Sequence, residues 1–150
     1  MPEPPAVAVE DARRVAAAAA DLLALHPEPG CADGANQVSD LLETLADVLL
    51  RWHDCLVGAT DLSLAGDVSA LAAGSITLPP VRDPGSADRH GLQVCAASLR
   101  RCAARLDRVA RAVPEPADRH TGEILAAVVG RLGDALAERA DQLRVDTLAR

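Results

Sequence analysis

Apolar residues recur at steps of three and four along most of the chain, the spacing of one face of an α-helix. One series comprises Val38, Leu42, Leu45, Leu49, Trp52 and Leu56. A second comprises Leu92, Cys95, Leu99, Cys102, Leu106, Val109 and Val113. A third comprises Leu125, Val128, Val129, Leu132, Leu136 and Leu143. Each stripe needs a partner surface to bury it, so the pattern predicts an all-α protein.

Proline and glycine clusters separate the periodic segments and place the ends of the predicted helices. We expect helices over about 7–25, 36–57, 87–113 and 117–148. Seven Gly or Pro residues interrupt the connection 58–87, in which 67–73 could form a short helix and 76–78 an extended segment. Gly130 and Gly133 weaken the last helix but allow a neighbouring helix to approach closely.

Short loops inside each helix pair make the paired helices antiparallel neighbours. The predicted fold is a single domain over 1–150, an antiparallel bundle of about four helices. It consists of two helical hairpins, 7–57 and 88–148, joined by the long connection 58–87. The expected course is up-down-up-down, with the end of the second helix beside the start of the third.

Composition excludes several classes of function. All fifteen basic residues are Arg, so a Walker A loop, Schiff-base catalysis and pyridoxal chemistry, which need Lys, are excluded. With one Trp and no Phe or Tyr, a base-stacking nucleic-acid platform is also disfavoured. The Arg-for-Lys and Ala-rich usage is typical of a high-GC bacterium.

The chain lacks an apolar run of membrane-spanning length, and its acidic, Pro-rich start is unlike a signal peptide. Four Cys without an export signal are expected to be reduced thiols. We therefore expect a cytoplasmic protein with no membrane association.

The main charge feature is a group of arginines in the third predicted helix. At 100° per residue they fall within an arc of about 140°, opposite the Leu/Cys/Val stripe. The group consists of Arg100, Arg101, Arg105, Arg108 and Arg111. Residues 1–86 carry net charge −9 and residues 87–150 carry +2. The arginines form either a face for an acidic partner or a solvated face neutralised by the chain's own acids; the acidic balance disfavours nucleic acid.

Two Cys and two His form a second candidate site. An up-down-up-down course would bring His53, Cys55, His90 and Cys95 to one end of the bundle, and such a set can hold tetrahedral zinc. However, His53 and Cys55 lie about 200° apart around their helix, so they do not converge easily on one ion. Cys95 and Cys102 occupy core positions, where we expect buried, metal-free thiols.

No catalytic signature appears in the chain, since it has neither a GxSxG nor a GxGxxG motif, and His120-x-x-Glu123 reverses the di-iron order and stands alone. The first 60 or so residues resemble, in general character, the small WXG-type substrates of type VII secretion. The motif here is Trp52-His53-Asp54, without Gly, and the chain has no Tyr for the export signal of that family. No family is assigned.

These observations predict a non-enzymatic helical module that binds another protein, or a second copy of itself, through an exposed helix face. No cofactor is expected. The alternative is a bundle that binds a small ligand or a metal through core Cys and His.

Overall fold

Five α-helices follow one another in the computed structural model, which describes residues 4–24, 32–74 and 86–148. They are α1 (Pro5–Ala24), α2 (Ala32–Leu56), α3 (Leu64–Ala73), α4 (Ser86–Arg111) and α5 (Pro116–Leu148). No strand occurs within these ranges, so the all-α prediction is confirmed. Side-chain surroundings are described for 4–22, 40–74 and 89–142; Val38, Leu143 and the predicted extended segment 76–78 lie outside them.

Several helix boundaries differ from the prediction. α2 begins at Ala32, one turn earlier than expected. α4 ends at Arg111, because Pro114 disfavours a helical conformation at the residue before it, and Val113 closes a turn onto the Ala110 carbonyl. α3 extends the short helix expected within the connection to Leu64, because Leu64 and Val68, four residues apart, are both buried.

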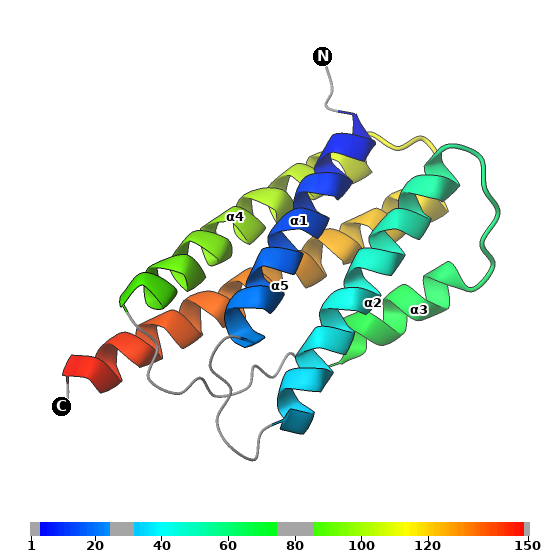
Figure 1. Ribbon diagram of the computed structural model, residues 1–150. Helices are drawn as coiled ribbons and strands as arrows, with labels where there is room; N and C mark the ends of the chain where they lie inside the picture. Colours follow the sequence, from blue (N-terminus) through cyan, green and yellow to red (C-terminus); the bar gives the residue numbers. More distant parts are fainter. Residues whose placement is uncertain (1–3, 25–31, 75–85, 149–150) are drawn as a thin grey trace.

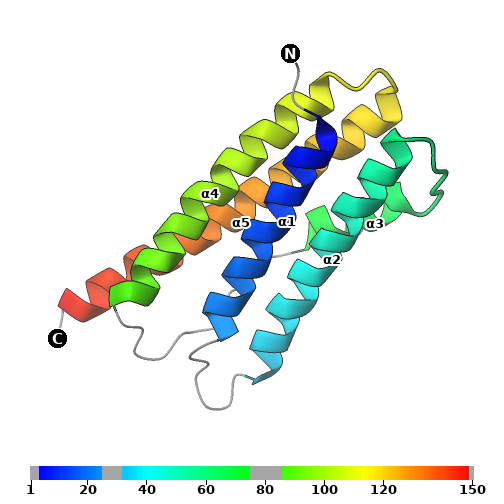
Figure 2. The same cartoon turned by 45° about the horizontal axis from the view of Figure 1, so that its top comes forward.

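α4 and α5 form an antiparallel hairpin with the most extensive helix contact in the molecule (Figure 1). α1 packs against both α4 and α2, and α3 packs against α2 and α5. Because α3 leads the chain back along α2, α4 starts at the opposite end from where α2 stops. α2 and α4 therefore run in the same direction on either side of α1 (Figures 1 and 2). The simple up-down-up-down course was wrong because it left out this reversal.

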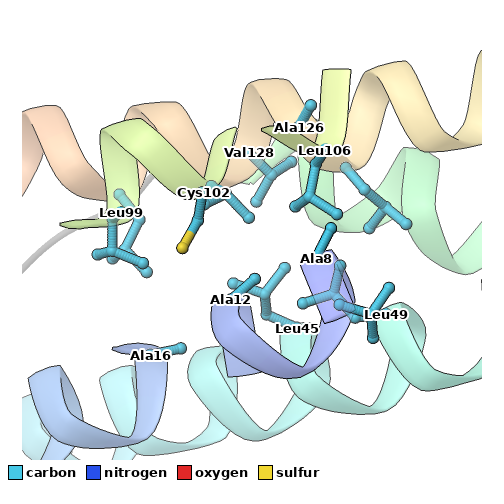
Figure 3. Packing of buried hydrophobic residues seen from close by; sticks show 14 of the residues in the cluster. Ala8, Ala12, Ala16, Leu45, Leu49, Leu99, Cys102, Leu106, Ala126 and Val128 are labelled. Carbon is cyan, nitrogen blue, oxygen red and sulfur yellow. The ribbon is translucent and has the colours of Figure 1, made fainter. Parts of the chain in front are cut away.

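The predicted stripes form the core. All seven apolar positions of the stripe from Leu92 to Val113 are buried, as are Leu42, Leu45, Leu49 and Trp52 of α2. They meet a face of α1 made of small residues: Figure 3 shows Ala8, Ala12 and Ala16 opposite α4, with the Cys102 sulfur pointing towards α1. These alanines allow α1 to lie close to α4. The sequence analysis did not predict this face of α1, because it has no periodic stripe of large apolar residues.

Trp52 fixes α2 to the start of α5. Its side chain is fully buried, and Nε1 donates a hydrogen bond of 2.8 Å to the backbone carbonyl of Asp118. The space for the indole depends on Gly122, where a Cβ would lie 2.4 Å from Trp52 Cζ2 and 2.8 Å from the Ala110 Cβ. The prediction that Trp52 is a core residue is confirmed.

A cluster of ion pairs around Arg51 holds one end of α3 in place. The Arg51 guanidinium donates to both carboxylate oxygens of Asp61, at 2.7 and 2.9 Å, and to Asp67 at 2.8 Å. The hydrogen bonds from Arg51 hold the pKa of Asp61 well below its usual range. At the other end of α3, Arg131 donates to the carbonyls of Ala72 and Gly74, which the helix terminus leaves without helical partners.

Candidate interaction surface

The inner side of α4 packs closely against α5. α5 approaches closely at Gly133, where a Cβ would lie 3.1 Å from the Ala96 carbonyl oxygen and 3.2 Å from Arg100 Cγ. The expected close approach is therefore present at Gly133. At Gly130 it is absent, since a Cβ there would make an ordinary contact of 3.6 Å with Ala103.

Three of the five predicted arginines are neutralised by the chain's own acids. Arg100 Nε donates to Asp134 of α5 at 2.9 Å, and Arg111 Nε lies 3.1 Å from Asp107, four residues earlier in α4. Arg105 is half-buried and donates to Asp11 of α1. Arg105 therefore joins two helices inside the molecule, and its assignment to an outward binding face was wrong.

Arg101 and Arg108 are different, since both are exposed and neither has an acidic partner among the residues that the structure describes. Arg101 makes one hydrogen bond, of 3.1 Å, to the Ser98 hydroxyl in its own helix. The two arginines are seven residues apart, so they lie on the same side of α4, about 10.5 Å apart along its axis. They are the part of the predicted group that remains available to an acidic surface.

Further exposed residues continue this line along α4. We call the line the α4 outer stripe, and it consists of Val94, Ala97, Arg101, Ala104, Arg108 and Arg111. Each member lies two residues after a core position, about 200° around the helix. The stripe is therefore a consequence of the same heptad-like spacing that builds the core.

A cavity of about 800 Å³ lies where the start of α1, the end of α2 and the α4–α5 turn meet. Its lining is mostly apolar and includes Leu56, Val109 and Val113. Arg108 contributes the positive charge of the lining, and Glu115 and Asp118 contribute negative charges. The sequence analysis did not identify this cavity, because its walls come from three segments that are distant in the sequence.

The proposed gathering of Cys and His is contradicted. His53 and Cys55 lie near the end of α2 and His90 and Cys95 near the start of α4, at opposite ends of the molecule (Figure 1). Among the described residues, no group of three His, Cys, Asp or Glu side chains is placed to hold a metal ion.

The cysteines of α4 lie in the core. Cys95 and Cys102 are buried, as predicted, and burial raises the pKa of both thiols. Cys55 is half-buried, and burial, followed by the negative charge of Asp118, raises its pKa. The thiols are therefore held in the protonated, less nucleophilic form.

Of the predicted group, Arg101 and Arg108 are therefore the arginines that are exposed and without an acidic partner in the described ranges. Within the described ranges, every helix is too short or too polar to cross a bilayer. Comparison with known proteins finds no match to a family model, to a curated protein or to a solved structure.

Proposed function

We propose that the protein is a non-enzymatic interaction module whose four long helices act as one bundle and present the α4 outer stripe to an acidic protein surface. The observation that carries the proposal is the difference between Arg101 and Arg108 and the other three arginines of the predicted group. The other three are engaged with Asp134, Asp11 and Asp107, whereas these two are exposed without an acidic partner in the described part of the chain. The proposal includes the cytoplasmic, bacterial setting expected from the sequence.

Charge on such a surface acts mainly on the rate and selectivity of association. An exposed guanidinium attracts acidic surfaces and disfavours basic ones, while adding little to affinity by itself. The exposed apolar side chains Val94 and Ala97 supply contact area on the same stripe. A protein partner suits this combination better than nucleic acid does, because the whole chain carries a net charge of −7.

The test compares two double variants with the same change of charge. Arg101→Glu with Arg108→Glu reverses the unpaired arginines, and Arg14→Glu with Arg100→Glu reverses two that pair with Asp11 and Asp134. Arg105 is left unchanged, because reversing it would break a contact between α1 and α4. Each protein is immobilised, exposed to extract of the source cells, and its bound proteins are quantified.

We expect the first variant to lose the proteins that wild type retains and the second to keep them. Raising the salt should also release them, since screening shortens to about 3 Å at molar ionic strength. A random-sequence DNA duplex added to the extract should not compete. Equal retention by wild type and the Arg101/Arg108 variant would contradict the proposal.

The cavity at the α4–α5 turn supports the alternative, a bundle that binds a small ligand. Its apolar lining fits an apolar ligand body, and Arg108 fits an anionic group on it. This site replaces the Cys/His core as the place for such a ligand. Ala112, an exposed residue of the lining, offers the test: if the alternative holds, Ala112→Trp should abolish any ligand-induced rise in melting temperature.

A further inference from the structure

α2 carries an outer stripe of opposite charge. We call it the α2 outer stripe, and it consists of Asp40, Glu43, Asp47, Leu50 and Asp54. All five residues are exposed; four lie two residues before a buried core position such as Leu42 or Leu45, and Asp54 lies two residues before the partly buried Leu56. Four of the five are acidic, so this side of α2 presents a line of carboxylates.

Most of this acidity is left without a counter-charge. Asp47 lies 3.5 Å from Arg51, a long contact to a guanidinium already engaged by Asp61 and Asp67. Asp40, Glu43 and Asp54 have no basic partner in the described part of the chain. The molecule therefore exposes an unneutralised acidic helix face as well as an unneutralised basic one.

The two stripes match in spacing as well as in charge. On α2, Leu50 stands three residues after Asp47 and four before Asp54; on α4, Ala104 stands three residues after Arg101 and four before Arg108. Both charged pairs therefore span about 10.5 Å, with an apolar residue between them. Leu50 is 42% exposed, and Ala104 leaves room for it, as a knob fills a hole between packed helices.

We propose that the α4 outer stripe docks on the α2 outer stripe of a second copy of this chain. In this pairing Arg101 and Arg108 face Asp47 and Asp54, and Leu50 packs on Ala104. The inference rests on the proposed function, because it uses the same unpaired arginines and names their partner. A second copy is a suitable partner, because each copy exposes an acidic stripe on α2 as well as the basic stripe on α4.

The direction of the helices fits the pairing of the charged residues. α2 and α4 run in the same direction on either side of α1, which packs against both (Figures 1 and 2). α4 of one copy can therefore lie against α2 of another in parallel, the orientation in which Arg101 meets Asp47 and Arg108 meets Asp54.

Two variants with reversed stripes test the inference by sedimentation equilibrium of the full chain. Arg101→Glu with Arg108→Glu places acidic side chains opposite Asp47 and Asp54, and Asp47→Arg with Asp54→Arg places basic side chains opposite Arg101 and Arg108. Each variant alone should dimerise at least about a hundredfold more weakly than wild type, because like charges then face each other. An equimolar mixture should dimerise again, because each stripe then meets its opposite in the other variant.

A matched control shows whether total charge is enough to explain the effect. Glu138→Arg with Asp141→Arg on α5 changes the charge as much as the α2 reversal does, at exposed positions outside both stripes. This variant should dimerise as wild type does, and circular dichroism should show all variants folded. Restored dimers in the mixture confirm the pairing without depending on either variant alone.

A monomeric wild type at all protein concentrations, or a mixture that stays monomeric while wild type dimerises, would overturn the inference. The extract experiment separates this outcome from failure of the proposed function. A monomeric protein that still binds a different protein through Arg101 and Arg108 overturns only the choice of partner.

Discussion

Replacing Gly122 by Ala tests the fixed position of Trp52 at the junction of α2, α4 and α5. The new methyl group would lie 2.4 Å from Trp52 Cζ2 and 2.8 Å from the Ala110 Cβ. Neither neighbour can move easily, because the indole is fully buried and hydrogen-bonded to the Asp118 carbonyl. The substitution therefore overpacks the core where two helices are already in contact.

The size of the effect follows from two opposing contributions. Ala is favoured over Gly within a helix by about 1 kcal/mol, whereas overpacking costs about 1–3 kcal/mol and occasionally more. We take the upper end for two contacts under 3 Å, so Gly122→Ala should lower the free energy of unfolding by about 2 kcal/mol. At Gly130 in the same helix, the nearest contact would be 3.6 Å, and Ala should stabilise by about 1 kcal/mol.

Urea unfolding followed by circular dichroism and by the fluorescence of the single Trp measures both variants. The two should differ by about 3 kcal/mol, or about 6–12 °C in melting temperature for a chain of this size. The diagnostic result is a loss of stability for Gly122→Ala and a gain for Gly130→Ala, because the same substitution is made twice in one helix. If Gly122→Ala is as stable as wild type or more so, the described packing around Trp52 is wrong.

Three further predictions concern the core face of α4, the ion pairs around Arg51 and the thiols of α4. Leu99→Ala should cost about 2–5 kcal/mol in urea melts, because it opens a core cavity, whereas Arg101→Ala should stay within about 0.5 kcal/mol. The stabilising contribution of Asp61, whose pKa is lowered on folding, is present above the unfolded pKa of about 3.9 and is lost as the pH falls through the folded pKa. The difference in melting temperature between wild type and Asp61→Asn should therefore be full at neutral pH and shrink below pH of about 4. Cys95 and Cys102 should react slowly with a thiol reagent in native protein and quickly in urea, as followed by peptide mass spectrometry.

Each of these three predictions has an outcome that would contradict it. Equal destabilisation by Leu99→Ala and Arg101→Ala would reverse the assignment of the α4 faces. A melting difference at Asp61 that grows in acid would remove the carboxylate from the cluster. Fast labelling of both cysteines in native protein, or bound zinc that is lost when Cys95 is replaced, would contradict buried, metal-free thiols. Either result would favour the hypothesis that the bundle binds a ligand or metal through Cys and His.

The sequence was most informative where large apolar residues follow a strict period. All seven positions from Leu92 to Val113 are buried, because only one face of a helix can accommodate them. The inner face of α1 could not be predicted in the same way. Ala16 and Ala19 are buried and Ala17 and Ala18 exposed, and a run of identical residues carries no pattern to separate them.

The candidate site was predicted only in part, because contacts between distant segments decide it. Arg105 and Asp11 are separated by 94 positions, so no local pattern shows that they pair. α3 was expected only as a short helix at 67–73 within a long connection, and the reversal of chain direction that it introduces places His53 away from His90. In contrast, Arg101 lies opposite the core stripe, where helical periodicity alone put it.

A photo-activated cross-linker at Ala104, midway between Arg101 and Arg108, tests the central claim most directly. Ala104 is exposed, and so is Ala127 of α5, which serves as the control position. The account predicts a product of twice the chain mass from the Ala104 probe alone, joined to the α2 peptide that contains Leu50. A probe at Ala104 that yields no such product, or that joins a second copy elsewhere than α2, would contradict it.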